Sequence, residues 1–433
     1  MKRKMAAVWV SLALCLTFAA GCDHTPELVQ TELSVESSIE STESTETTET
    51  NKSIDITVEP SEELPPEPSK PREATEEDLA VIQDYDTKYF VKKLTGVEKY
   101  WFVELYRAAI NFEKTATFET PPSEDELTKL MILLNYDCPE LIQLSGDYFP
   151  EYGGDDLNSV TAVGLSYCMK EKEYTEGWKK LDTFYKIIKQ KTEGKTDYEK
   201  ELIVYDWLFH NCVYQEDGDY VGSIYGALVD NTARCEGFSK AFEWCMRKLG
   251  IECMALYGTQ SFNLSSSFLA HSWNIIRLDG NYYQVDLTVD NTQRDDTKSF
   301  PPNYGCLNLP DSMILSKREI DPSVRSLGVP VCSGTKYCYH MMNGSFIKSG
   351  EASREQLIEM MKTYDTPEGM KTMAVKYESA EDYKAALDYA REAADLFKEK
   401  YAQVKDDYVI YYSEVGQTIT IQRMSSTQIT SRG

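Results

Sequence analysis

The segment from Ala270 to Asn291 constrains the fold more than any other stretch of the chain. It reads AHSWNIIRLDGNYYQVDLTVDN, and apolar or β-branched residues alternate on both sides of Asp279 and Gly280. Asp-Gly is a preferred two-residue connection between antiparallel strands. The segment therefore predicts a β-hairpin that turns at Asp279 and Gly280.

The register of this hairpin brings a histidine and an aspartate together. If Leu278 pairs with Asn281, continued pairing puts His271 opposite Thr288. Because strand side chains alternate with period two, His271 and Asp286 then lie on one face as diagonal neighbours. A carboxylate in that place can hold an imidazole and stabilise its charged form. Taken alone, the hairpin fits a half-exposed structural pair at a sheet edge better than a catalytic pair.

A cysteine stands at the start of a predicted helix upstream of the hairpin. The apolar residues that follow recur at spacings of three and four, as on one face of a helix: Phe238, Ala241, Phe242, Cys245, Met246 and Leu249. Gly250 is a natural stop for this helix. Cys235 therefore lies at the helix N-terminus, where backbone N–H groups and the helix dipole favour a thiolate. We expect a depressed pKa for Cys235, whereas Cys245 is expected in the core.

Cys235, His271 and Asp286 supply the three groups that an acyl-transfer site needs. These are a nucleophile, a base and a carboxylate that orients the base. Each of the three is a weak signal alone, and their order and predicted secondary structure strengthen the hypothesis.

Five stretches of the chain follow one another in a familiar order. They are DYEKELIVYDWLFHNCVY, YGALVDNTARCEGFSKAF, LGIECMALYG, HSWNIIRLDGNYYQVDLTVDN and YGCLNLPDSMILSKREI. Together they resemble the transglutaminase-like (transglutaminase/protease) superfamily, in the form common in bacterial secreted proteins and lipoproteins. The resemblance implies that Cys235 is the nucleophile, His271 the base and Asp286 the orienting acid.

The chain departs from the family pattern at three places. Arg234 replaces a residue that is usually small or apolar, and Val289 stands where tryptophan is frequent. YGCLNL replaces a segment that usually begins YFL. None of these changes removes a member of the triad.

The resemblance implies an α+β fold with a papain-like or transglutaminase-like core, in which the helix carrying the cysteine packs on an antiparallel sheet. We expect this catalytic domain over residues 196–322, after a mixed helical and strand region over 75–195. Residues 323–433 show the pattern of a small C-terminal α/β accessory domain with the order β-α-β-α-β-β. Ser123 and Ser379 are predicted helix N-caps.

The N-terminus has the features of an export signal. Three basic residues precede an apolar run that ends in FAAGC, which resembles the lipobox of bacterial lipoproteins. We expect residues 1–21 to be a lipoprotein signal peptide and Cys22 to be the lipidated mature N-terminus. Residues 22–74 are a predicted disordered linker, because they are rich in Ser, Thr, Glu and Pro and show no apolar periodicity. The predicted location is the extracellular face of the bacterial cell membrane.

Charge and cysteine spacing limit the partners. A formal net charge of −26 without a basic stripe makes nucleic acid a poor partner. No pair has C-x-x-C spacing and histidines are few, so we expect no metal ion or other cofactor. Disulfides are allowed outside the cell, and Cys332 and Cys338 are the closest pair that could form one; buried free thiols fit equally well. The oligomeric state is open.

The sequence leaves three functions open. The first is a membrane-anchored cysteine peptidase or amidase that cleaves amide bonds through a thioester. The second is a protein-glutamine transamidase, in which a lysine amine replaces water. The third is a non-catalytic surface binding protein on the same scaffold. The expected substrate is a peptide or protein, with cell-wall peptides among the candidates.

Overall fold

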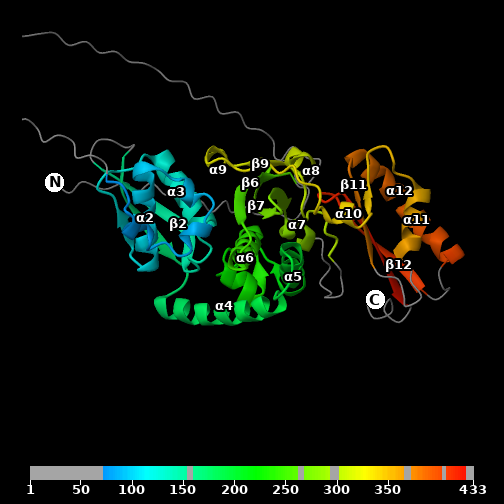
Figure 1. Cartoon of the computed structure of the whole chain (residues 1–433), viewed down its shortest axis with the longest axis horizontal. Helices are drawn as coiled ribbons and strands as arrows, with labels where there is room; N and C mark the ends of the chain where they lie inside the picture. The colour runs from blue at the N-terminus through cyan, green and yellow to red at the C-terminus, as the bar shows by residue number, and fades with distance from the viewer. Residues whose placement is uncertain are drawn as a thin grey trace, which may run out of the picture. The chain divides into compact units, whose positions relative to one another are not determined.

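The computed structural model describes residues 72–153, 159–261, 268–292, 302–364, 372–401 and 406–425 (Figure 1). The predicted signal peptide, the predicted lipid site Cys22 and nearly all of the acidic linker lie outside these residues. In the ranges described, no helix combines the length and apolar character that a membrane span needs.

The N-terminal region combines helices with a three-stranded antiparallel sheet of order β1-β3-β2. Its elements are α1 (Glu76–Leu79), η1 (Tyr85–Thr87), η2 (Val91–Lys93), α2 (Gly96–Ile110), β1 (Thr115–Thr117), α3 (Glu124–Tyr136), β2 (Leu144–Tyr152), β3 (Val160–Tyr167) and α4 (Glu171–Lys191). Helix α3 begins as predicted, because Ser123 accepts the Glu126 N–H and the Glu126 carboxylate accepts the Ser123 N–H in a capping box.

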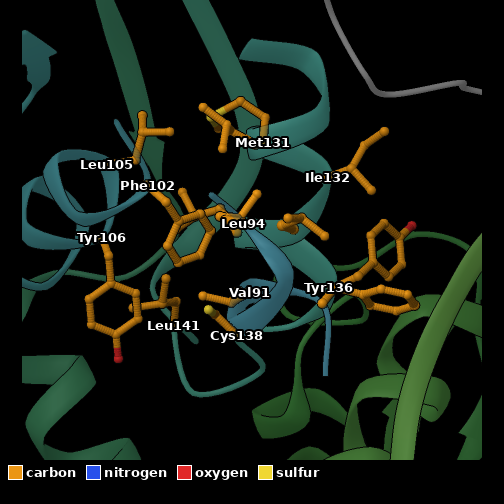
Figure 2. Close-up of a cluster of buried hydrophobic side chains, with 14 of the residues drawn as sticks. Val91, Leu94, Phe102, Leu105, Tyr106, Met131, Ile132, Tyr136, Cys138 and Leu141 are labelled. Carbon is orange, nitrogen blue, oxygen red and sulfur yellow. The ribbon is translucent and has the colours of Figure 1, made fainter. Parts of the chain in front are cut away.

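The core of the N-terminal region continues into the central sheet. Figure 2 shows Phe102 and Leu105 of α2 in one apolar cluster with Met131 and Tyr136 of α3. The same cluster contains buried residues of the central sheet, namely Met254, Ala255, Leu256, Trp273, Ile275 and Ile320. The N-terminal region therefore covers one face of that sheet.

The central region is built on an antiparallel sheet of order β8-β7-β6-β9. Its elements are α5 (Asp197–Asn211), β4 (Val213–Tyr214), the π-helix η3 (Gly226–Asp230), β5 (Thr232–Ala233), α6 (Cys235–Lys248), β6 (Cys253–Gln260), β7 (Leu269–Leu278), β8 (Asn281–Val285), α7 (Leu287–Thr292), α8 (Asp311–Ile314), η4 (Leu315–Lys317), β9 (Arg318–Ile320) and α9 (Pro322–Ser326). Helices and antiparallel strands together make the protein an α+β structure, as predicted.

The predicted hairpin turn is present between β7 and β8. Leu278 pairs with Asn281, and Asp279 and Gly280 both have positive φ angles, 46° and 80°. A two-residue turn of this kind matches the right-handed twist of the strands and needs residues that tolerate positive φ. The turn chemistry therefore fixes the predicted register.

Helix α6 covers the second face of the central sheet (Figure 1). Phe238 and Phe242 of α6 pack in a separate cluster with Ile276, Leu278 and Val285 of the hairpin. Neighbouring residues of β7 thus point to opposite faces, Ile275 toward the N-terminal region and Ile276 toward α6, as strand geometry requires. Both faces of this sheet are buried.

The predicted extension of the hairpin to Thr288 is wrong. Strand β8 ends at Val285, and Leu287–Thr292 forms helix α7, so Thr288 does not face His271. The cause is Asp286 itself, because its Oδ1 accepts the N–H of Val289 at 3.1 Å. A carboxylate that accepts an N–H three residues later is a typical helix N-cap, and it ends the strand.

From β10 onward the C-terminal region has the predicted order β-α-β-α-β-β, around a sheet of order β10-β11-β13-β12, and the short helix α10 precedes β10. Its elements are α10 (Tyr339–Met342), β10 (Phe346–Ile347), α11 (Arg354–Tyr364), β11 (Met373–Tyr377), α12 (Ala380–Tyr401), β12 (Asp406–Ser413) and β13 (Thr418–Ser425). Ser379 accepts the Asp382 N–H at 3.0 Å, as predicted for the start of α12.

A buried lysine links this region to the central one. Lys376 of β11 is buried, and its ammonium donates to the backbone carbonyls of Gly305 at 2.9 Å and Gly416 at 2.6 Å. Two carbonyl oxygens thus accept hydrogen bonds from an ammonium in a place from which water is largely excluded.

No disulfide joins any of the nine cysteines in the described residues. Cys332 and Cys338, the pair considered for a disulfide, are each buried separately and are not bonded to each other. Both contribute apolar surface to cores, which is a usual role of a buried thiol.

Candidate active site

Cys235 is the first residue of α6, as its sequence position predicted. The N-cap is Arg234, whose backbone is extended and whose side chain makes no capping hydrogen bond. The first-turn N–H groups of α6 therefore have no side-chain acceptor at the cap. Gly237 lets the preceding loop lie close to this turn, because a Cβ there would come within 2.2 Å of the carbonyl oxygen of Val221.

His271 and Asp286 are in direct contact, as the hairpin predicted. The distance from His271 Nε2 to Asp286 Oδ2 is 2.7 Å, and both side chains are buried. The imidazole lies nearly parallel to the indole of Trp273, with ring centroids 6.0 Å apart and an interplanar angle of 13°. An ionised carboxylate accepts only, so Nε2 carries a proton and Nδ1 is the nitrogen that would exchange one with a nucleophile.

The thiol lies beside the strand that carries this histidine. The backbone N–H of Ser272, the residue after His271, is close enough to the Cys235 sulfur to lower the pKa of the thiol. Below that point the Asn274 side chain donates to the carbonyl of Ser239 in α6 at 2.9 Å. These two links hold the start of α6 against β7, so Cys235 and His271 belong to one site.

Asp286 is held in its ionised form by several donors. Its Oδ2 accepts both His271 Nε2 and Arg318 Nη2, at 2.7 Å and 2.5 Å, while Oδ1 accepts the Val289 N–H. Burial by itself raises the pKa of this carboxyl. The positive charge of Arg318 and the contact with His271 outweigh burial and hold the pKa of Asp286 at about 2.

The predicted depression of the Cys235 pKa is wrong in this structure. Burial is the largest influence and raises the pKa of the thiol to about 12, with a further increase from the adjacent Glu236 carboxylate. The Ser272 N–H and Arg234 act in the opposite direction but are weaker. The helix start alone does not compensate for desolvation and a neighbouring negative charge.

Glu236 is the centre of a charge network next to Cys235. Its Oε1 accepts Asn135 Nδ2 at 2.8 Å and Lys240 Nζ at 2.7 Å, and its Oε2 accepts Arg234 Nη2 at 2.7 Å. Burial raises the pKa of Glu236, but the ion pairs with Lys240 and Arg234 outweigh it and hold the pKa at about 2. Since Asn135 belongs to α3, the N-terminal region helps to build this site.

Three tyrosines surround the thiol closely enough for it to influence their ionisation. They are Tyr136 of α3, Tyr214 of β4 and Tyr257 of β6, and the pKa of each is raised mainly by burial. The rings of Tyr136 and Tyr257 stack with centroids 5.3 Å apart. Tyr214 pairs with Ala233, two residues before Cys235, through the parallel pairing of β4 with β5.

The main site residue that sequence reasoning missed is Arg318. It stands in the segment LSKREI, which was used only for the family resemblance. The only signal in the sequence was a basic residue within that segment. Two residues of the HSWN motif also gain roles that were not predicted, since Ser272 contacts the sulfur and Asn274 ties β7 to α6.

Comparison with known families agrees with the fold. The family model described as "Transglutaminase-like superfamily" matches residues 186–287, which include Cys235, His271 and Asp286. The human protein named kyphoscoliosis peptidase is 27% identical over 107 residues, which cover 22% of this chain and 16% of the human protein. The match thus spans less than a fifth of that relative.

Two solved structures also align with the chain. One is described as a TGase, with 11% identity and a TM-score of 0.25, and the alignment covers 43% of this chain and 53% of that one. The other is the periplasmic domain of TgpA from Pseudomonas aeruginosa, with 14% identity and a TM-score of 0.21, covering 30% of this chain and 56% of that one.

Proposed function

Because the chain contains a transglutaminase-like domain, we propose that it is a cysteine enzyme that cleaves amide bonds through Cys235, His271 and Asp286. The observation that carries this proposal is the 2.7 Å hydrogen bond between His271 and Asp286 on the strand that holds the helix-start thiol. The sequence similarity to a peptidase supports cleavage of a peptide bond. The substrate class is peptide or protein, with cell-wall peptides as candidates.

The reaction begins with formation of a thioester. His271 Nδ1 takes the proton of the Cys235 thiol as the sulfur attacks the carbonyl carbon of the substrate. The negative charge that develops on the carbonyl oxygen is stabilised by first-turn N–H groups of α6, which have no side-chain cap. His271 then donates its proton to the leaving amine, and the C–N bond breaks.

Hydrolysis of the thioester completes the cycle. His271 removes a proton from water, the oxygen attacks the thioester carbonyl, and the thiolate leaves and is reprotonated from the imidazolium. Throughout, Asp286 holds the Nε2–H and so keeps Nδ1 directed to the sulfur. If an amine replaced water in this step, the same acyl-enzyme would give transamidation.

The enzyme is proposed to act outside the cell, anchored to a bacterial membrane by lipid on Cys22. This rests on FAAGC followed directly by the acidic linker. Mass spectrometry of the protein from its native membrane fraction should find a lipidated N-terminal Cys22. A different N-terminus, or a fully soluble secreted form, would refute the anchor.

A thiol-reactive acyl probe tests the catalytic proposal. Wild-type protein should be labelled at Cys235, and Cys235→Ser should lose the label. Cys245→Ser is the matched control, because Cys245 lies on the same helix but is buried in the core. Labelling that persists in Cys235→Ser, or disappears in Cys245→Ser alone, would contradict the proposal. Adding a primary amine to the labelled enzyme then distinguishes hydrolysis from transamidation by the mass of the released product.

A further inference from the structure

The residue before Cys235 is an arginine whose donors are only partly used. Arg234 donates to one carboxylate oxygen, Glu236 Oε2, from Nε at 3.2 Å and from Nη2 at 2.7 Å. Within the described part of the chain its third nitrogen, Nη1, has no hydrogen-bond partner, and the side chain is 39% exposed. The guanidinium therefore has donors left for a further acceptor.

The charges around Arg234 leave one cation in excess. Glu236 also accepts Lys240 Nζ at 2.7 Å, and both of these residues are buried. Because Lys240 by itself balances the charge of Glu236, Arg234 is not required to neutralise this carboxylate. The excess is local, since the formal net charge of the whole chain is −26.

Arg234 is fixed from several sides. Its backbone N–H donates to the carbonyl of Val221 at 3.0 Å. A Cβ at Gly222 would come within 2.9 Å of Glu236 Oε2 and 3.1 Å of Arg234 Nη2, so the loop backbone lies directly against the ion pair. Asn135 of the N-terminal region donates to Glu236 Oε1 at 2.8 Å. A cation held in this way loses little side-chain entropy when it binds a ligand.

Tyr136 brings a second donor to the same place. The residue is 7% exposed, and no described residue hydrogen-bonds its hydroxyl. Burial is the largest influence on the pKa of Tyr136 and raises it, and Glu236, Cys235 and Arg234 act on it as well. The hydroxyl therefore lies among these three groups and stays protonated, so it can donate a hydrogen bond.

The position of Tyr136 is determined by its surroundings. Its chain neighbours Asn135 and Asp137 are both bonded to α6, and its ring stacks on that of Tyr257 with centroids 5.3 Å apart. Burial is the largest influence on the pKa of Tyr257 too, but there the next is Asp321. Tyr136 is thus the phenol beside Arg234, and Tyr257 supports it from behind.

We propose that Arg234 and Tyr136 form a subsite for a carboxylate of the substrate, which makes acidic peptides the preferred substrates at Cys235. The Nη1 group and the phenol both donate to this carboxylate. The inference rests on the proposed function, because the subsite selects among substrates of that reaction. Since Arg234 directly precedes Cys235, the carboxylate belongs close to the bond that is cleaved. An acidic side chain and a peptide C-terminus both supply this chemistry.

Glu216 is the acidic group that opposes such selection. It accepts a hydrogen bond from the hydroxyl of Tyr214, which Cys235 and Arg234 also influence. Repulsion by Glu216 and by the acidic chain as a whole acts at longer range than the direct hydrogen bonds. At physiological ionic strength the Debye length is about 8 Å, which weakens distant repulsion but not a contact. The tests are therefore carried out at that ionic strength.

The first test compares two alkylating reagents that differ in charge. Iodoacetate carries a carboxylate next to its reacting carbon, and iodoacetamide is its neutral analogue. The ratio of their rates at Cys235 cancels any change in the pKa of the thiol, because both reagents need the same thiolate. In the full wild-type chain this ratio should be about tenfold higher than for N-acetylcysteinamide, an uncharged free thiol. A ratio equal to that of the free thiol would overturn the inference.

Variants identify the residues that are responsible. Arg234→Gln should bring the ratio to that of the free thiol, and Tyr136→Phe should lower it about threefold. Arg277→Gln is the control for the first, because Arg277 is also partly exposed and pairs with a glutamate, Glu252, at 3.4 Å. Tyr257→Phe is the control for the second, and both controls should keep the wild-type ratio. If Arg234→Gln lowers only the melting temperature, the arginine is structural and the inference fails.

The second test identifies the source of the carboxylate. Alanine-based pentapeptides are compared as protectants of Cys235 against iodoacetamide in the wild-type chain. One has a central glutamate and an amidated C-terminus, one has glutamine in its place, and one has only alanines and a free C-terminus. The glutamate peptide should protect at about tenfold lower concentration than the glutamine peptide if a side chain is recognised. The same advantage for the free C-terminus would assign the subsite to a terminal carboxylate. No advantage for either would overturn the inference.

The outcomes also separate this inference from the proposed function. If Cys235 prefers iodoacetate and acidic peptides protect it, while no acyl probe labels it, the subsite stands and the proposed function fails. If the acyl probe labels Cys235 but the alkylation ratio matches that of the free thiol, the proposed function stands and the inference fails.

Discussion

The side chain of Asn274 in β7 donates a hydrogen bond of 2.9 Å to the backbone carbonyl of Ser239 in α6. Both groups are buried, and Ser239 lies one helical turn after Cys235, whose carbonyl accepts the Ser239 hydroxyl at 2.7 Å. The side-chain amide of Asn274 thus links the strand that carries the proposed base to the helix that carries the proposed nucleophile. We expect the alignment of the two elements to depend on this contact.

Replacing Asn274 should impair both stability and the site. In Asn274→Ala the buried carbonyl of Ser239 loses the side-chain donor that it has beside its helical hydrogen bond, at a cost of about 0.5–1.5 kcal/mol. We expect a lower melting temperature together with slower acyl-probe labelling of Cys235. Asn343→Ala is a suitable control, because Asn343 makes the same kind of bond to a backbone carbonyl, that of Tyr339, at an exposed position. Unchanged labelling per folded molecule would show that the contact does not align the site.

Replacing each of the three proposed triad members should reduce turnover by a different amount. Cys235→Ala should abolish turnover, and His271→Ala should be nearly as severe because both the base and the acid are lost. Asp286→Asn should reduce kcat by up to about 10⁴-fold, since the ring loses its orienting carboxylate. The double variant Cys235→Ala with Asp286→Asn should be no worse than Cys235→Ala alone, because the three groups act as a unit.

Folding has to be measured beside activity in these variants. Asp286→Asn also leaves Arg318 without its carboxylate, so its melting temperature should fall more than that of Cys235→Ala. Activity is therefore normalised to the folded fraction, taken from circular dichroism. Normal activity per folded molecule in His271→Ala would mean that the histidine is structural.

The pH dependence of Cys235 alkylation follows from its raised pKa. The thiolate is the reactive form, and the pKa of this thiol is about 12. In the absence of an acyl substrate, the rate of reaction with iodoacetamide should therefore climb about tenfold per pH unit between pH 6 and 9 without a plateau. Peptide mass spectrometry after short exposures gives the rate at each pH.

Cys168 is the matched reference for this experiment. It is also partly exposed, and burial raises its pKa to about 11. The two thiols should show parallel rises with pH. A plateau for Cys235 that begins below pH 7 would instead reveal a preformed thiolate and would contradict the raised pKa of this thiol.

Lys376 should matter for the active site although it belongs to the C-terminal region. It holds the carbonyl of Gly305, and the next residue, Cys306, accepts the backbone N–H of Asp286 at 2.9 Å and donates its own N–H to Asp290. In Lys376→Met two buried carbonyls lose their donor, so both the melting temperature and the labelling rate of Cys235 should fall.

A surface lysine provides the comparison for Lys376. Lys398 makes a partly exposed ion pair with Asp407 at 3.7 Å. Lys398→Met should therefore leave both the melting temperature and the labelling rate of Cys235 unchanged. Hydrogen exchange at the Asp286 amide gives a local readout, with faster exchange expected in Lys376→Met only. Protection equal to that of the wild type would mean that the C-terminal region does not support the Asp286 loop.

The hairpin was predictable because turn chemistry and alternation act locally. Asp279 and Gly280 fix the register through their positive φ angles, and period two then determines which face His271 occupies. Helix starts at Ser123 and Ser379 were predictable for the same reason, since a cap involves residues three apart.

The features that were missed depend on contacts between distant parts of the chain. Arg318 reaches Asp286 only because β9 adds to the edge of β6, and a three-residue strand carries little local signal. The pKa of Cys235 depends on burial and on Glu236, which helix position alone does not reveal. The end of β8 was misplaced because the role of Asp286 as a helix cap competes with continued pairing.

The two-sided cover of the central sheet has a consequence for how this chain can be divided. The segment that matches the family model, residues 186–287, brings α6 to one face, but the cover of the other face comes from residues before it. A fragment limited to that segment would present Leu256, Trp273 and Ile275 to water as a contiguous apolar surface. During synthesis the N-terminal region, which covers one face of the central sheet, leaves the ribosome before the strands of that sheet do. We therefore expect the family-sized segment to aggregate when expressed alone, and to become a self-sufficient folding unit only when it is extended back to about residue 72 and forward through β9.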